Sequence, residues 1–314
     1  MNGLKLLSTG RCLPKRAVSN EEMRQYVDTS DEWIASRTGI RQRYFCGEGE
    51  GSISLASAAA QKALDRAGIR PDQIGLCIVS TLTPEYATPS VACMVQHNLG
   101  LPEDIPAFDI NAACSGFLYS LNIASAMLPA LNRPYALLIG CEVLSRMLDM
   151  TDRSTCVLFG DGAGAAIVEC SDTHPFIGTL GARGDAEALG CPGFGMDAPH
   201  KIYMDGQAVF RFATQTIPQC IGNILEKAGL TLDDIDHVVC HQANARIIRH
   251  AERKLRAREG QFYVNVDRYA NTSAASIPLA LDEMNDLGLL TAGKRILCVG
   301  FGAGFTWGGA LLTL

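Results

Sequence analysis

An internal duplication sets the strongest constraint on how this 314-residue chain can fold. The segment 63–81, ALDRAGIRPDQIGLCIVST, aligns without gaps on ILEKAGLTLDDIDHVVCHQ at 224–242. Two further pairs follow in the same order, FDINAACSG with RYANTSAAS and FGDGAGAAIVE with GFGAGFTWGGALLTL. Asn111 in the first copy matches Asn271 in the second, 160 positions later. This period is far longer than a solenoid repeat, so we expect two similar halves, 1–170 and 171–314.

Each copy of the first pair has the same local pattern. A predicted helix ends at a glycine, Gly68 or Gly229, and a short acidic turn leads into a buried, β-branched strand. Alternating helices and buried strands predict the α/β class, with a mostly parallel sheet covered by helices in each half. We expect a functional site where the two halves meet.

Composition excludes several classes of protein. With 47% hydrophobic residues, 19% charged residues and a net charge of −6, the chain is globular and lacks the basic surface of a nucleic-acid-binding protein. Its 12 cysteines are scattered singly, so we expect reduced thiols and neither disulfides nor a metal site. No apolar run approaches the length of a membrane span, and the first residues do not form a signal peptide. We therefore expect a cytoplasmic protein.

The duplication also shows where the copies differ. Cys114 matches Ala274, and His241 matches Ser80. The segment AFDI is predicted as a strand and FLYSLNIASAMLPAL as a helix, which places Cys114 at the start of that helix, where the helix terminus favours the nucleophilic thiolate. Taken alone, however, Cys114 would be interpreted as one more buried thiol.

Two further polar residues occupy matching turns. His241 follows the predicted strand HVVC, where a neutral imidazole can donate a hydrogen bond to an oxygen that gains negative charge. Asn271 is expected at another strand-to-helix turn, although asparagine is also common there as a cap. A cysteine, a histidine and an amide together are also found in Cys-His-Asn hydrolases, and spacing alone does not exclude peptidase chemistry.

Along its whole length the chain resembles the β-ketoacyl-acyl-carrier-protein synthase III family, which has the thiolase fold. The resemblance implies two pseudo-symmetric α/β halves packed as a layered sandwich. Its pattern has one histidine and one asparagine, whereas the elongating synthases have two histidines. The motifs that carry the resemblance are VDTSDEWIASRTGIRQR (27–43), DINAACSGF (109–117), DRSTCVLFGDGAGAA (152–166), MDGQAVFRFA (204–213), HQAN (241–244), NTSAASIP (271–278) and GFGAGFTWG (300–308).

The resemblance implies a decarboxylative Claisen condensation of an acyl-CoA primer with malonyl-acyl carrier protein. Cys114 would accept the acyl group, and its amide and that of Ala303 would form the oxyanion hole. His241 and Asn271 would bind the thioester carbonyl of the malonyl substrate while CO2 leaves. The reaction would be ping-pong, give 3-oxoacyl-ACP in fatty acid synthesis, and need no metal or redox cofactor.

The resemblance also assigns binding residues, and it implies a homodimer. Adenine would stack between Trp33 and Arg153. In the implied dimer, Thr88 would reach from one subunit into the acyl pocket of its partner, where a residue smaller than Phe leaves room for primers longer than acetyl. The other implied coenzyme A contacts are Thr29, Arg37, Gly206, Phe210 and Asn244.

A predicted amphipathic helix follows HQAN and carries an arginine stripe. In an acidic protein this stripe suits an acidic partner, and the resemblance identifies that partner as acyl carrier protein. A merely solvated face is equally plausible for Arg253 and Arg256, whereas Arg246 lies next to the site. The stripe consists of Arg246, Arg249, Arg253 and Arg256.

Two rival functions share these residues. One is a condensing enzyme or acyltransferase of specialised metabolism, and the other is a catalytically silent subunit that only binds carrier protein. The intact set of Cys114, His241 and Asn271 speaks against the silent subunit.

Overall fold

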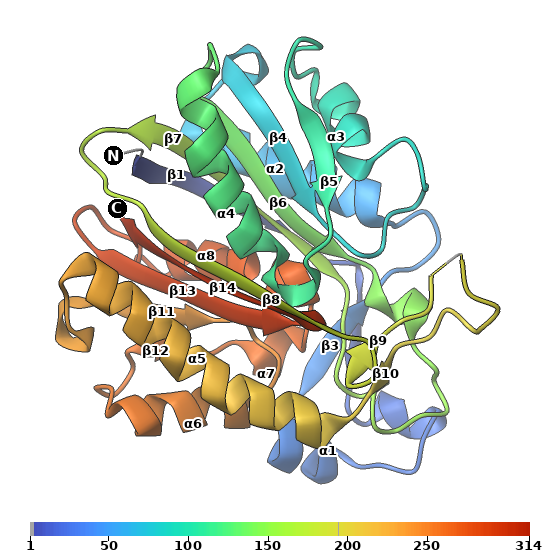
Figure 1. Ribbon diagram of the computed structural model, residues 1–314. Helices are drawn as coiled ribbons and strands as arrows, with labels where there is room; N and C mark the ends of the chain where they lie inside the picture. Colours follow the sequence, from blue (N-terminus) through green and yellow to red (C-terminus); the bar gives the residue numbers. More distant parts are fainter. Residues whose placement is uncertain (1–2, 194) are drawn as a thin grey trace.

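The computed structural model describes residues 3–193 and 195–314, and two five-stranded sheets dominate this part of the chain (Figure 1). In one sheet the order is β1 (Gly3–Cys12), β7 (Gly162–Ser171), β6 (Tyr135–Glu142), β4 (Ile74–Ser80) and β5 (Ala107–Ile110). In the other it is β8 (Ile177–Asp185), β14 (Gly304–Thr313), β13 (Arg295–Gly302), β11 (His237–Cys240) and β12 (Phe262–Tyr263).

The two sheets share one topology. In each, four strands run the same way and one, β7 or β14, runs against them. The expected mostly parallel sheets are therefore confirmed. The predicted boundary after residue 170 lies one residue before the end of β7, and the division into halves 1–170 and 171–314 stays a prediction.

Helices separate and cover the sheets, as Figure 1 shows. The outer face of the first sheet packs against α2 (Ser52–Ala67) and α3 (Val91–Leu99), and that of the second against α5 (Gly206–Ala228) and α6 (Ala245–Leu255). Between the sheets lie α4 (Gly116–Met127) and α8 (Ser276–Asp286). The five layers alternate α-β-α-β-α, which is the expected layered sandwich.

The middle layer forms a core that both sheets share. Phe117 and Leu121 of α4 and Leu281 of α8 are at most 1% exposed. Burying a large apolar side chain contributes about 1.5–3 kcal/mol, so this layer binds the sheets strongly to each other. The strands contribute Leu4, Leu6, Leu76, Ile78, Leu138, Val168, Val239, Ile296, Cys298 and Leu312 to the same core.

The repeated helix ends form as predicted. Gly68 ends α2 and Gly229 ends α5, both left-handed with φ of 64° and 65°. Each is followed by a short 3-10 turn, η2 (Pro71–Gln73) or η6 (Leu232–Asp234), before the buried strand begins.

Smaller elements pack together near the carboxyl ends of the parallel strands. Cys114 follows β5 and His241 follows β11, so both lie at these ends. Among the described residues, none of the helices combines the length and apolar character that a bilayer crossing requires. The smaller elements are β2 (Arg16–Ser19), η1 (Glu22–Gln25), α1 (Asp31–Thr38), β3 (Gln42–Phe45), η5 (Leu144–Met147), β9 (Leu189–Gly190), β10 (Tyr203–Met204) and α7 (Val266–Tyr269). The short turn η4 (Leu128–Ala130) instead follows α4, and its Leu128 packs in the core between the sheets.

Candidate active site

Two matching turns form the centre of the site. Cys114 lies in η3 (Ala113–Ser115), directly before α4, and η7 (Ser273–Ala275) directly precedes α8. Both turns begin with a left-handed residue, Ala113 at φ 46° and Ser273 at φ 50°. A residue with a side chain pays roughly 1–3 kcal/mol for this conformation, so the surrounding structure must hold both turns in place.

An asparagine holds each turn. Asn111 Oδ1 accepts the Ala113 N–H at 3.1 Å, and Asn271 Oδ1 accepts the Ser273 N–H at 2.8 Å. Asn271 follows the single helical turn α7, not the strand that we expected. Because its oxygen is engaged by Ser273, the amide nitrogen is the group of Asn271 that can donate to a substrate.

A cavity of about 740 Å³ opens beside these turns, and Cys114, His241 and Asn271 all line it. They come from three distant segments, and their exposed fractions are 8%, 1% and 7%. The structure therefore brings the three predicted catalytic residues, all of them buried, to the wall of one cavity.

His241 is held as a neutral hydrogen-bond donor. Burial lowers its pKa to about 3. Its Nδ1 lies 2.7 Å from Ser276 Oγ, and that oxygen accepts the Gln242 N–H at 3.3 Å. The Ser276 hydroxyl can donate its own proton to Nδ1, and in that arrangement the imidazole proton lies on Nε2. This tautomer can donate a hydrogen bond to a carbonyl oxygen.

Cys114 rests as a thiol. We expected the start of the helix to favour the thiolate, but burial is the larger effect and raises the pKa of Cys114 to about 12, against a hydrogen bond with Ser273 that lowers it. The thiol must therefore lose its proton during the reaction itself.

The turn between β13 and β14 lies against the Cys114 amide. A Cβ on Gly302 would lie 2.6 Å from Cys114 N, which leaves no room for a side chain there. Thr306 ties this turn to η3, because its Oγ1 donates to Ala112 O at 2.8 Å and lies 3.2 Å from Ala303 O. This close packing sets the turn that carries Ala303 beside Cys114.

Most of the predicted coenzyme A residues line the same cavity, namely Trp33, Arg37, Arg153, Gly206, Phe210 and Asn244. Arg153 Cζ lies 4.6 Å from the Trp33 ring centroid, so an adenine between the two must first part them. Asn244 already caps α6 through Oδ1 and donates to Arg37 O at 3.1 Å. Thr29 is not in the lining, and its hydroxyl is buried without a partner among the described residues.

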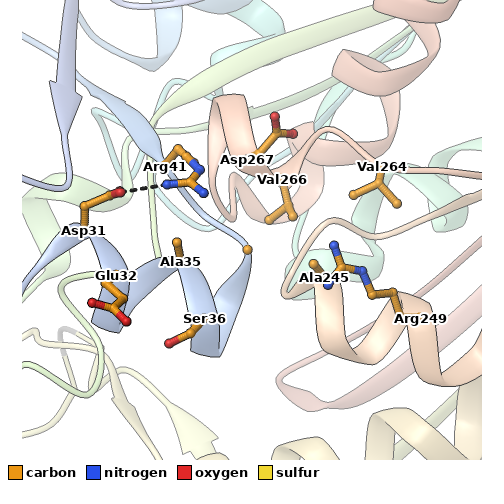
Figure 2. Close-up of a pocket in the computed structure, with 11 residues that line it drawn as sticks. Asp31, Glu32, Ala35, Ser36, Arg41, Ala245, Arg249, Val264, Val266 and Asp267 are labelled. Carbon is orange, nitrogen blue, oxygen red and sulfur yellow. Dashed lines mark hydrogen bonds and ion pairs between the residues drawn. The ribbon is translucent and has the colours of Figure 1, made fainter.

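The predicted arginine stripe lies on the exposed face of α6, while Ala245, Ile247, Ile248 and Ala251 are buried. Arg246 lines the cavity and stacks 5.6 Å above the Phe210 ring. Arg249 lines a separate hollow between α1 and α6, where Figure 2 shows it across from Ser36 and Glu32. A third hollow, on the surface of α6, is lined by Arg246, Arg249 and Arg253. Arg256 ends the helix, away from all three hollows.

Thr88 lies in an exposed loop and does not line the cavity of its own chain. The sequence argument missed three polar residues behind the site: Glu142, Ser273 and Ser276. Only Glu142 has a sequence signal, since it is an acidic residue that ends the apolar strand YALLIGCE.

Comparison with known proteins identifies the family. Two family models match, 3-oxoacyl-[acyl-carrier-protein (ACP)] synthase III over residues 108–184 and its C-terminal counterpart over residues 225–314. The β-ketoacyl-[acyl-carrier-protein] synthase III of Rhizorhabdus wittichii is 47% identical over 98% of both chains.

Two solved structures are similar over nearly their whole length. The 3-oxoacyl-[acyl-carrier-protein] synthase III of Aquifex aeolicus has a TM-score of 0.94 and is 41% identical, over 99% of this chain and 100% of that one. The priming β-ketosynthase of the R1128 polyketide pathway has a TM-score of 0.91 and is 36% identical, over 99% and 96%. With this identity along the full length, the chain belongs to the β-ketoacyl-acyl-carrier-protein synthase III family.

Proposed function

We propose that Cys114, His241 and Asn271 carry out the reaction of this initiating condensing enzyme, in which an acyl-CoA primer and malonyl-acyl carrier protein give 3-oxoacyl-ACP, CoA and CO2. The observation that carries the proposal is that these three buried residues, from distant segments, line one cavity. Their low exposure matters, because an acyl-enzyme is lost to hydrolysis and an enolate to protonation where water reaches them.

In the first half-reaction, Cys114 Sγ attacks the thioester carbonyl of the primer. The amides of Cys114 and Ala303 stabilise the oxyanion, and collapse of the tetrahedral intermediate breaks the bond to the CoA sulfur. Acyl-Cys114 and CoA are the products. Thr306 supports this step by fixing the two amides relative to each other.

In the second half-reaction, His241 Nε2–H and the Asn271 amide N–H donate to the thioester carbonyl of the malonyl group. As CO2 leaves, negative charge collects on that oxygen, and the two donors stabilise the enolate. Its carbon then attacks acyl-Cys114 and releases the thiolate. All steps use thioester substrates, and we assign no role to a metal or a redox cofactor.

The same geometry disfavours a Cys-His-Asn hydrolase. Such an enzyme needs a histidine that accepts the thiol proton and an asparagine oxygen that orients the ring. Here the low pKa of His241 makes it a poor base, Ser276 orients its ring, and Asn271 Oδ1 is engaged by Ser273.

For the partners, we propose that acyl carrier protein docks on the arginine stripe of α6, since four exposed arginines form a basic face on a chain of net charge −6. A homodimer is supported by β5, which ends the strand order of its sheet, so that within the described residues its outer edge has no partner strand, and whose Phe108 and Ile110 are partly exposed. The exposed Thr88 loop could then enter the partner subunit. The cytoplasmic location stays a prediction.

Intact mass spectrometry of Cys114→Ala after incubation with acyl-CoA tests the central claim. The wild type should gain one acyl group at Cys114, and the variant none. A stable acyl adduct on the variant would refute the assignment. Lack of an adduct on the wild type would favour the silent subunit.

A condensing enzyme of specialised metabolism is the second candidate, suggested by the likeness to the R1128 priming ketosynthase. Measuring products with and without malonyl carrier protein separates the two. A fatty-acid initiator forms 3-oxoacyl-ACP only when that substrate is present.

A further inference from the structure

Glu142 is a fully buried carboxylate that the reaction above does not use. Its Oε2 accepts three hydrogen bonds, from Thr83 Oγ1 at 2.8 Å, Leu82 N at 3.1 Å and Thr81 Oγ1 at 3.3 Å. Its Oε1 accepts one, from Ser273 Oγ at 3.1 Å, and no other group in the described part of the chain binds it. The two oxygens therefore differ in the number of hydrogen bonds that they accept, and Oε1, which accepts only one, is the oxygen that can take up a proton.

Ser273 connects this carboxylate to the nucleophile. Its turn packs tightly on β6 and η3, since a Cβ on Gly140 would lie 2.2 Å from Ala274 O. Burial raises the pKa of Cys114, a hydrogen bond with the Ser273 side chain lowers it, and the charge of Glu142 raises it. Ser273 is thus the group that contacts the thiol, and Glu142 acts on it by its charge from behind Ser273.

We propose that Ser273 and Glu142 form a proton route that deprotonates Cys114, an inference that rests on the proposed role of Cys114 as nucleophile. As Sγ attacks the primer, its proton moves to Ser273 Oγ, and the Ser273 hydroxyl proton moves to Glu142 Oε1. The departing CoA thiolate takes a proton from solvent.

Glu142 keeps its proton while Cys114 is acylated. When the condensation releases the Cys114 thiolate, the proton returns through Ser273. The cycle then consumes one solvent proton, which is the number required when a malonyl carboxylate leaves as neutral CO2. Ser273 contacts the reacting sulfur, whereas Glu142 acts through it.

The ionisation of the neighbouring groups fits this route. Burial raises the pKa of Glu142 to about 7, which suits a group that accepts and returns a proton at neutral pH. Cys141, beside it on β6, has a pKa well above its usual range, mainly through burial. Asp161, before β7, has a pKa raised by burial. The segment 81–83 and η7 offer Glu142 only hydroxyls and an amide.

The test measures acylation of Cys114 by acyl-CoA in a single turnover, with quenched intact-mass detection, across pH 5.5–9. The wild-type rate should rise with pH as Glu142 loses its proton and level off above about pH 7. Glu142→Gln should be slower by roughly 100-fold, at the low end for general base catalysis, and lose this inflection. Ser273→Ala should show the same loss of acylation rate and of the inflection. The double variant should acylate no more slowly than either single variant, because both residues serve one route.

Two controls separate a proton route from a structural role. Asp282→Asn removes another buried carboxylate, which binds Arg11 and Arg66, and should leave the acylation rate and its pH profile unchanged. Glu142→Gln should still decarboxylate malonyl carrier protein, because that step uses His241 and Asn271. A parallel loss of decarboxylation would make Glu142 structural and overturn the route.

The outcomes also separate this proposal from the proposed function. An unchanged acylation rate in Glu142→Gln, with the adduct still on Cys114, overturns the proton route alone. An adduct on a different residue in the wild type overturns both proposals.

Discussion

Replacing Ser276 by alanine should damage decarboxylation while sparing acyl transfer. The Ser276 hydroxyl is the partner of His241 Nδ1 at 2.7 Å, in a site where the histidine is 1% exposed. Without it, Nδ1 is left unpaired, and the imidazole proton is no longer confined to Nε2. Leaving a buried polar atom unsatisfied costs about 1–3 kcal/mol. If this cost is added to the barrier for decarboxylation, the rate of that step falls about 5-fold to 150-fold.

The assay is release of labelled CO2 from malonyl carrier protein, alongside single-turnover acylation by acyl-CoA. Ser115→Ala is the matched control, because the Ser115 hydroxyl is also fully buried yet has no partner among the described residues. It should leave both steps near the wild-type rate. If Ser276→Ala slows acylation as much as decarboxylation, or changes neither, the tautomer argument is wrong.

Three further predictions follow from the site. His241→Ala should keep acylation, seen by intact mass, and lose malonyl decarboxylation by about 100-fold or more, as expected for removal of an oxyanion donor; the opposite pattern would reverse the roles. Asn271→Ala should lose decarboxylation alike, but it also removes the acceptor of the Ser273 N–H and should slow acylation as Ser273→Ala does. Arg246→Glu should raise KM for malonyl carrier protein far more than KM for acyl-CoA, and added salt should erase the difference, whereas equal losses would make α6 structural. The native enzyme should accept primers longer or more branched than acetyl, because each methylene that fits the pocket gains about 0.8 kcal/mol of binding free energy. The Thr88→Phe variant should be restricted toward acetyl-CoA. A strict acetyl preference in the native enzyme and in the variant would show that other residues set the depth of the pocket.

The repeat predicted more of the structure than any single motif did. The 160-residue offset placed Asn111 and Asn271 in turns that prove to have the same backbone conformation and the same hydrogen bond. A repeated fold repeats its local geometry, so gap-free alignment of two segments is evidence about backbone shape. Two of the three proposed catalytic residues stand where the copies differ, Cys114 opposite Ala274 and His241 opposite Ser80, whereas Asn271 has its match in Asn111.

Features that depend on contacts between distant segments were not predictable. Glu142 meets Ser273 131 positions away, and only the packing of η7 on β6 brings them together. Cys114 stays protonated because distant segments bury its side chain, and no local sequence pattern predicts how complete that burial is. The contact of Arg153 with Trp33 likewise joins two distant segments, and no sequence pattern in either one predicts that they meet.

The middle layer of α4 and α8 has a consequence for how this protein loses its structure. Residues 276–284 of α8 are buried along their whole length, and both sheets supply the surfaces that bury them. Neither sheet can open alone without exposing this layer, so unfolding should be one cooperative transition. Because η3 and η7 begin these two helices, the catalytic turns should lose their shape in that same transition, and heat inactivation should coincide with global melting. If the chain were divided near residue 170, α4 would remain with the first sheet and α8 with the second, and each helix would expose the apolar face that now packs on the other sheet.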